Sequence, residues 1–326
     1  MTTRSPSRRR RLALAGSIAL AMSLALAACG SSSSDDKAAE PTTRTVQTTK
    51  GAVTVPAHPV RVIAGTAWAV DTLMDLGITP VGAFNGAANV VEPKYRAAMA
   101  KVPNISASDG YSDDLEKIAA LKPDLIITFA SSPTYAKESA IAPTIGQDAT
   151  KDGWEQLSAQ VADAVNRSTD LASLKKTYEQ DLASLKSTYG KVIAAHRWYV
   201  VQPGDGGNPA TLYAPANTEI GKLITQLGGR FGKAEAGTHY GDNNTVGKGI
   251  SAEDLSKLSD GDFIFVWDNG DQPSEQATKL FNQALWKQLP AVSAGHVTRT
   301  SMPASYGQVT SFLDVLASAC KKLGTP

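Results

Sequence analysis

The residue types that most often do chemistry are few in this sequence and lie far apart. The four histidines, His58, His196, His239 and His296, include no pair at the spacing of metal ligands. The sequence also lacks a nucleophile elbow and a His-Glu-x-x-His motif, and its glycine-rich stretch 204–209 lacks the lysine of a phosphate-binding loop. We therefore expect no enzyme, no resident cofactor and no site for a bare metal ion.

Cys29 is the residue whose surroundings predict a chemical modification. Four arginines, Arg8 to Arg11, precede the apolar run Leu12 to Ala28, as in a secretory signal peptide. The run ends in Leu26-Ala27-Ala28-Cys29, which resembles the lipobox of bacterial lipoproteins, where the signal is cut before a lipid-bearing cysteine. We predict a signal peptide over 1–28, lipid on Cys29 and a flexible polar tether over 29–44. Export by the Sec or the twin-arginine route stays open.

A second group of side chains is suited to binding rather than to catalysis. Aromatic residues make up only 6% of the chain, yet many of them fall just past the ends of expected strands. Ligands of open α/β sheets lie at the carboxyl ends of the strands. We therefore predict a ligand-binding cleft lined by Trp68, Asn85, Tyr111, Tyr135, Gln202, Tyr213, Trp267, Arg299 and Tyr306.

The elements that would position these residues alternate between strands and helices. In the first half, apolar strands are expected at 59–65, 80–84 and 123–129, with helices at 69–76 and 115–121. The second half repeats the scheme, with strands at 198–201 and 262–267 and a helix at 218–227. Apolar strands separated by helices indicate a parallel sheet that is covered on both faces.

A long helix separates the two halves. Apolar residues recur every three or four positions from Leu171 to Val192, and neither glycine nor proline interrupts 170–189. The sequence therefore predicts an α/β protein with two parallel-sheet lobes, a single long connecting helix and a ligand cleft between the lobes. We expect an N-terminal lobe over 45–167, the connecting helix over 168–195 and a C-terminal lobe over 196–326.

Composition narrows the class of protein further. Lysine and arginine total 32 against 31 acidic residues, so removal of the signal arginines leaves a mildly acidic chain. A nucleic-acid-binding protein would show a basic excess instead. Cys320, the second of two cysteines, lies in an apolar helical pattern and is expected to be a buried small hydrophobic residue.

Several segments in order are similar to one family, the substrate-binding lipoproteins of ABC importers for iron–siderophore complexes, haem and cobalamin. The resemblance covers about Thr45 to Pro326, and its most specific part is the segment 114–127. The segments 58–63, 76–82, 286–292 and 295–297 also carry it. It implies two α/β lobes joined by a rigid helix, and a lipid-anchored protein on the extracytoplasmic side of the cell membrane. It also implies a partner, an ABC permease with its ATPase.

The ligand that we favour is a ferric hydroxamate siderophore. Its iron is saturated by its own oxygens, so aromatic residues and one arginine suit it, whereas a ferric catecholate would need a cluster of basic residues. Haem, bound through His239 or a tyrosine, and cobalamin are the alternatives within the family. A surface lipoprotein that senses or adheres, without transport, is the alternative from another class.

Two glutamates are candidates for docking to the permease. Glu116 and Glu253 occupy similar places in two segments that look duplicated, 115–124 and 252–262. The resemblance implies that a glutamate on each lobe pairs with arginines of the permease. The alternative is a first-turn glutamate that is favoured by the helix dipole alone.

Overall fold

The computed structural model describes residues 42–109, 112–204, 207–234 and 247–324. The described chain begins with an antiparallel hairpin of β1 (Thr43–Thr48) and β2 (Gly51–Pro56), which starts two residues before the predicted lobe boundary. Arg44 pairs with Asp163 at 2.9 Å, and the hydroxyl of Thr49 donates to the carbonyl of Gly146. These contacts hold the hairpin on the N-terminal lobe.

The N-terminal lobe is built on a four-stranded parallel sheet in the order β4-β3-β5-β6. The strands are β3 (Val62–Ala64), β4 (Gly82–Ala83), β5 (Leu125–Phe129) and β6 (Thr144–Gln147). Alternate residues face opposite sides, so Val62 and Ile127 join one core while Ile63 and Ile126 join another. The helices are α1 (Ala67–Asp75), α2 (Ala87–Val90), α3 (Pro93–Met99), α4 (Leu115–Ala120), α5 (Tyr135–Glu138) and α6 (Trp154–Ala164).

The C-terminal lobe has a mixed sheet in the order β10-β8-β7-β11-β12, with β9 also paired to β7. Its centre is parallel, whereas β8 and β10 run antiparallel because β8 returns directly from β7 through a short connection. The strands are β7 (Arg197–Pro203), β8 (Ala210–Tyr213), β9 (Arg230–Phe231), β10 (Gly247–Ile250), β11 (Phe263–Trp267) and β12 (Val297–Thr300). The helices are η1 (Pro215–Asn217), α8 (Glu219–Gln226), η2 (Glu253–Asp260), α9 (Glu275–Asn282), α10 (Ala284–Lys287), α11 (Pro290–Ser293) and α12 (Tyr306–Leu323).

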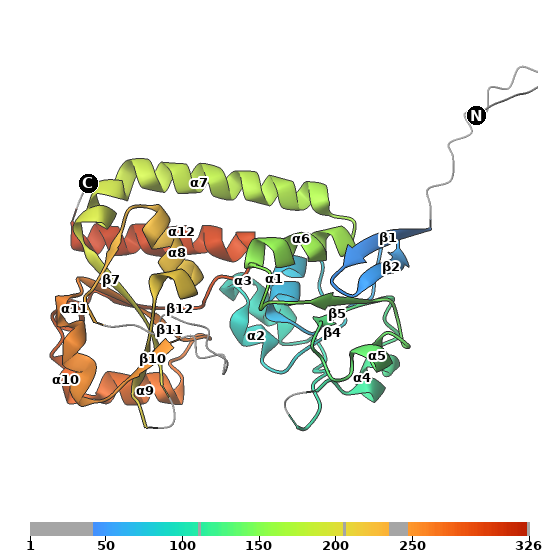
Figure 1. The fold of residues 1–326 in the computed structure, drawn as a ribbon, viewed down its shortest axis with the longest axis horizontal. Helices are drawn as coiled ribbons and strands as arrows, with labels where there is room; N and C mark the ends of the chain where they lie inside the picture. The colour runs from blue at the N-terminus through green and yellow to red at the C-terminus, as the bar shows by residue number, and fades with distance from the viewer. Residues whose placement is uncertain (1–41, 110–111, 205–206, 235–246, 325–326) are drawn as a thin grey trace, which may run out of the picture. The chain divides into compact units, whose positions relative to one another are not determined.

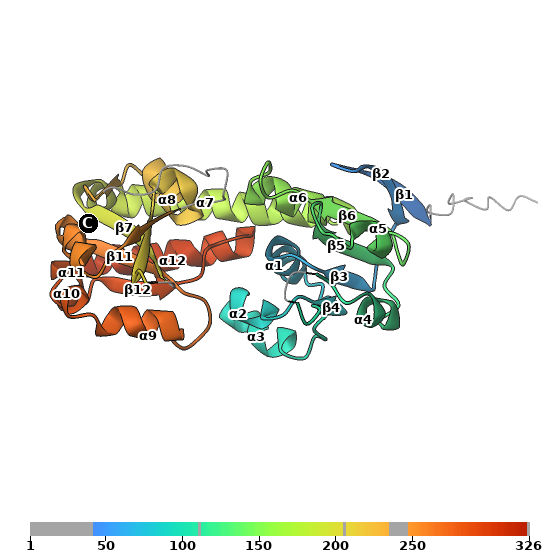
Figure 2. The ribbon, with the colours of Figure 1, turned by 60° about the horizontal axis from the view of Figure 1, so that its bottom comes forward.

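The long helix α7 (Ser168–Ala195) joins the lobes, and α12 lies alongside it in both views (Figures 1 and 2). At 1.5 Å per residue it is about 42 Å long. Its buried residues Leu171, Tyr178, Leu185 and Val192 recur every seven positions, which places them on one face. The predicted fold class, two α/β lobes with one long connecting helix, is confirmed. The C-terminal sheet, however, is mixed rather than wholly parallel as predicted, because β8 and β10 pair antiparallel.

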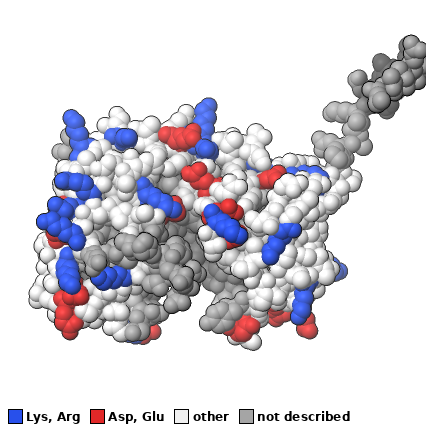
Figure 3. Space-filling model, viewed as in Figure 1, with Lys and Arg blue, Asp and Glu red and all other residues white. Residues whose placement is uncertain are grey.

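Several smaller features agree with this architecture. Cys320 is buried in α12, and burial raises the pKa of its thiol to about 12, so it packs as a small apolar residue. Lys, Arg, Asp and Glu are interspersed on the face shown in Figure 3. No helix in the described part of the chain has the length and apolar character to cross a membrane.

Candidate ligand-binding cleft

A cavity of about 500 Å³ lies between the lobes at the carboxyl ends of their strands. Trp68 at the start of α1 and Trp154 at the start of α6 line it from the N-terminal lobe. Tyr213 and Trp267, the last residues of β8 and β11, line it from the C-terminal lobe, and their rings are 5.6 Å apart. Four aromatic side chains therefore surround a space that is large enough for a small-molecule ligand.

The cleft continues into the N-terminal lobe as a second cavity of about 890 Å³. Trp68 and Phe129 meet there edge to face, with ring centroids 6.2 Å apart. Asn85 lines this cavity as well, and its backbone N–H donates to the hydroxyl of Ser106 at 3.0 Å. This half of the cleft combines an aromatic wall with hydroxyl and amide groups.

Asp113 is the perturbed acid of this second cavity. Burial raises its pKa from 3.8 to about 6, and the charge of Glu138 raises it further, while a hydrogen bond from Thr128 opposes the shift. Its carboxyl is therefore partly protonated near pH 6. A group that titrates there can accept or donate a hydrogen bond to a ligand, depending on pH.

Polar groups of the two lobes face each other across a third cavity of about 450 Å³. Asn85 lines it from the N-terminal lobe, and Gln202 and Trp267 line it from the C-terminal lobe. The hydroxyl of Tyr213 donates to Oε1 of Gln202 at 2.5 Å, which fixes both side chains. The structure thus brings five of the predicted residues together: Trp68, Asn85, Gln202, Tyr213 and Trp267.

Tyr135 and Tyr111 are not part of this arrangement. The hydroxyl of Tyr135 donates to the carbonyl of Thr144 at 3.1 Å, so its ring packs on β6, and it does not line the three cavities above. The sequence did not reveal β6 and therefore could not place the tyrosine against it. Tyr111 lies outside the described residues, as do Cys29 and His239.

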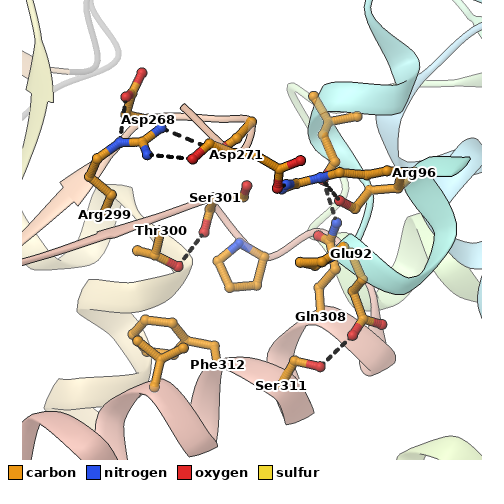
Figure 4. A pocket seen from close by; sticks show the side chains of 16 residues that line it. Glu92, Arg96, Asp268, Asp271, Arg299, Thr300, Ser301, Gln308, Ser311 and Phe312 are labelled. Atoms are coloured by element: carbon orange, nitrogen blue, oxygen red, sulfur yellow. Dashed lines mark hydrogen bonds and ion pairs between the residues drawn. The ribbon is translucent and has the colours of Figure 1, made fainter. Parts of the chain in front are cut away.

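Arg299 is directed toward Asp268 and the loop after β11 (Figure 4), and it is not among the residues that line the aromatic cavity. Its Nε donates to Oδ2 of Asp268 at 2.8 Å, and its terminal nitrogens donate to the carbonyls of Gly270, Asp271 and Gln272. It lines a separate cavity of about 340 Å³. Its guanidinium therefore holds the loop that follows Trp267.

Tyr306 is a core residue, with 4% of its surface exposed. As the first residue of α12 it packs between Trp154 and Tyr178, with ring centroids 4.8 and 5.9 Å away. Burial raises its pKa to about 12, and the nearby acids Glu155 and Glu179 add to the shift. The sequence suggested a cleft residue, but α12 inserts its N-terminus into the core beside α6.

Trp154 is an aromatic lining residue that sequence reasoning missed. It follows Gly153, whose extended backbone leads from the loop after β6 into α6. A signal was present, because a tryptophan at the start of a helix just past a strand matches the pattern of Trp68. That signal could not be used, because the sequence did not reveal β6.

The charge of the interlobe cavity is predominantly negative. Among the residues that line it, Asp71, Asp152 and Glu219 are acidic and Lys222 is basic. Lys222 pairs with Glu219 at 2.8 Å, and Oδ2 of Asp152 accepts a hydrogen bond from Gln160. Within the described residues, no group of three or more His, Cys, Asp or Glu side chains could hold a metal ion.

The two candidate docking glutamates are both exposed but lie in different local structures. Glu116 is in the first turn of α4, where Oδ1 of Asp114 accepts hydrogen bonds from the backbone N–H groups of Glu116 and Lys117. Glu253 is the first residue of the 3₁₀ helix η2, which has no side-chain cap. The resemblance between the two segments therefore does not extend to their capping.

Comparison with known proteins agrees with this architecture. The periplasmic binding protein family matches residues 62–303. YhfQ of Bacillus subtilis (strain 168), described as a substrate-binding lipoprotein of an ABC transporter, is 30% identical over 286 residues, or 83% of this chain and 84% of YhfQ. The iron(3+)-hydroxamate-binding protein FhuD of the same organism is also 30% identical, over 294 residues that cover 83% and 84% of the two chains.

Solved structures show the same fold. The siderophore periplasmic binding protein from the fuscachelin gene cluster of Thermobifida fusca superposes with a TM-score of 0.67 at 23% identity. The match covers 82% of this chain and 98% of that protein. The matched family model spans most of the two lobes and the helix between them, and we conclude that the chain belongs to the periplasmic binding protein family.

Proposed function

We propose that this protein is a lipid-anchored, extracytoplasmic binding protein that captures a ferric siderophore, with a hydroxamate favoured, and delivers it to an ABC permease. The observation that carries the proposal is the aromatic cavity between the lobes, whose lining contains no arginine among the described residues. A ferric trishydroxamate is uncharged at its iron centre and presents an apolar shell. A ferric catecholate carries about three negative charges and would need basic partners.

Tryptophan fluorescence tests the ligand class. Trp68, Trp154 and Trp267 line the cavity, so a ferric hydroxamate should quench emission, and the iron-free chelator should bind less well. Replacement of Trp68 and Trp267 by Phe should reduce the quenching. Trp286 is buried in a core of the C-terminal lobe, so Trp286→Phe is the matched control and should leave the quenching by ligand in place.

The same titration separates the alternatives. Haem or cobalamin binding with no response to any ferric siderophore would favour the other ligands of this family. Tight binding of bare ferric ion alone would contradict the proposal. Siderophore binding without any association with a permease would favour a sensor of the same ligand.

The membrane anchor is tested by Cys29→Ser. Lipid on Cys29 is the anchor that we propose, so the variant should leave the membrane fraction and appear in the soluble fraction. Unchanged membrane association in high salt would contradict the lipoprotein assignment.

A further inference from the structure

Asp71 is a buried carboxyl at the wall of the interlobe cavity. Only 3% of its surface is exposed, yet it is among the residues that line the cavity. It lies one helical turn after Trp68 on α1, so the two side chains share one face of the helix. Within the described part of the chain, no group hydrogen-bonds to Oδ1 of Asp71. A buried oxygen without a partner is costly and indicates that something else satisfies it.

The neighbouring acids Asp75 and Glu92 accept hydrogen bonds from α12, whereas Oδ1 of Asp71 accepts none from the described residues. Oδ2 of Asp75 accepts the backbone N–H of Gly307 at 2.8 Å, in the first turn of α12. Glu92 accepts a hydrogen bond from Ser311 and pairs with Lys94 at 3.0 Å. The role of holding α12 against the N-terminal lobe is therefore filled by Asp75 and Glu92.

The groups around Asp71 suit a cation. Three tryptophans and Tyr213 line the same cavity, and the faces of aromatic rings attract ammonium groups. Lys222, the basic residue of the lining, is already paired with Glu219. A carboxyl combined with aromatic faces recognises an organic ammonium group by charge, hydrogen bonding and cation–π attraction.

We propose that Asp71 anchors a protonated amine carried by the ferric ligand, so that the protein prefers a cationic ferric hydroxamate to a neutral one. The assignment rests on the proposed function and adds a charge preference to it. The amine would occupy the aromatic interlobe cavity beside Trp68. The iron-bearing part of the ligand would then extend toward the larger cavity of the N-terminal lobe, which Trp68 also lines.

Because Asp71 is buried, the proposed contact with an amine should change its protonation state. Desolvation raises the pKa of Asp71 well above 3.8, the charges of Asp75 and Glu92 raise it further, and a hydrogen bond from Gln308 opposes them. A ligand ammonium would favour the ionised form, so binding should release a proton wherever free Asp71 is protonated. Asp152 and the Glu219–Lys222 pair also face the cavity, but they lie on other elements.

A matched pair of ligands tests the assignment. Ferrioxamine B carries one free amine, and its N-acetylated form is the same ferric complex without that charge. Wild-type protein should bind the free amine about tenfold more tightly or better, as expected for a charge-assisted contact. Asp71→Asn should remove this preference and keep its affinity for the acetylated complex. The control Asp148→Asn, at a carboxyl that pairs with Lys151 at 2.9 Å and is not among the residues lining the cavity, should keep this preference.

The outcomes separate this assignment from the proposed function. If wild-type protein binds both complexes equally, or if Asp71→Asn retains the preference, the assignment is overturned and siderophore binding stands. If neither complex binds, the hydroxamate preference of the proposed function is contradicted and the assignment fails with it. If Asp71→Asn does not fold, the assignment is tested by the proton release on ligand binding. Calorimetry of the wild type at pH 5, in buffers of different ionisation heat, measures this release. Proton release with ferrioxamine B but not with its acetylated form supports the contact, and equal release overturns it.

Discussion

At the scale of single residues, the structure separates side chains that face the cleft from those that build the scaffold under it. Trp68 follows β3 and Trp267 ends β11, and both reach the cavity, as their positions at strand ends predicted. Arg299 lies within β12 and holds the loop after β11, and Tyr306 follows β12 and packs in the core. A position past a strand end therefore indicates the right edge of the sheet and leaves the direction of the side chain undetermined.

The first prediction concerns Arg299, for which the structure indicates a role in stability. Asp268 is buried, so Arg299→Ala would leave its carboxylate without the guanidinium and should destabilise the protein by about 3 kcal/mol. Thermal or urea unfolding measures the change. Arg299→Lys keeps the positive charge but loses the guanidinium that donates to three carbonyls. Its stability should therefore lie between those of the wild type and Arg299→Ala. Lost ligand affinity with unchanged stability would instead restore the contact with ligand that the sequence suggested.

The second prediction concerns Asp75 and pH. Burial is the largest cause that raises its pKa from 3.8 to about 6, and hydrogen bonds from Ser305 and Gly307 oppose it. The folded state thus binds this proton more tightly than the unfolded state. The contribution to stability is full below about pH 4 and is lost as the pH rises through 6.

Lowering the pH from 7 to 5 should therefore add about 1 kcal/mol to the free energy of unfolding through Asp75. Urea unfolding at both pH values measures this gain. Asp75→Asn cannot titrate and should show a gain that is smaller by that amount. Asp113 also titrates near pH 6, and Asp113→Asn serves as the comparison. An unchanged pH dependence in Asp75→Asn would contradict the role of this group.

At the scale of elements, continuous apolar patterns were the most reliable guide. The buried strands β3, β5 and β11 and the helices α1, α4 and α8 lie where apolar runs and periodicity predicted them. The hairpin β1–β2, the strand β6 and the short helices α9 to α11 were not identified. Their segments are short or alternate with polar residues, and their positions are set by packing on the larger sheets, which single-sequence patterns do not contain.

The third prediction concerns an ion pair that connects elements of the two lobes. Arg96 on α3 pairs with Asp271 in the loop after β11, the loop that Arg299 also holds (Figure 4). Arg96 is 17% exposed and Asp271 is 72% exposed, so solvent screens the pair and its contribution is below about 1 kcal/mol. Because Trp267 and Asn269 in or beside this loop line the cleft, the pair should slow release of bound ligand.

Arg96→Asp should therefore raise the ligand dissociation rate by about threefold, and stopped-flow fluorescence measures this. The double exchange Arg96→Asp with Asp271→Arg should restore most of the wild-type rate, because the pair is re-formed with opposite polarity. The neighbouring Lys94→Asp, which pairs with Glu92 within one lobe, is the control. Failure of the exchange to rescue would show that the effect belongs to Arg96 alone.

At the scale of the whole molecule, α7 and α12 run side by side and limit relative motion of the lobes. One continuous helix of 28 residues has no pair of strands that could bend as a hinge. We therefore expect closure on ligand of only a few degrees, with little change in the radius of gyration on small-angle scattering. The fold class could be predicted from the sequence, because alternation of strands and helices on either side of one long amphipathic helix allows few architectures. The insertion of the N-terminus of α12 beside α6 could not, since it depends on contacts between residues far apart in the chain.

The fourth prediction follows from limited closure, since a permease must then recognise fixed surface groups. Glu116 on α4 and Glu253 on η2 are the proposed contacts, one on each lobe. Reversal of both to lysine should abolish uptake of the ferric ligand in cells and leave its affinity unchanged, because neither residue lines the cleft. Each exposed pair of a glutamate with a permease arginine contributes little to docking, but the reversed charges add repulsion against a basic partner.

The control for this prediction reverses two other exposed glutamates, Glu179 on α7 and Glu275 on α9, each of which pairs with a lysine one turn away on its own helix. Both double variants carry the same net charge, so a difference in uptake reports position rather than charge. Uptake at the wild-type rate in Glu116→Lys/Glu253→Lys would place the docking surface elsewhere. Equal loss in both variants would assign the effect to net charge, because long-range attraction to the permease does not depend on which glutamates supply it.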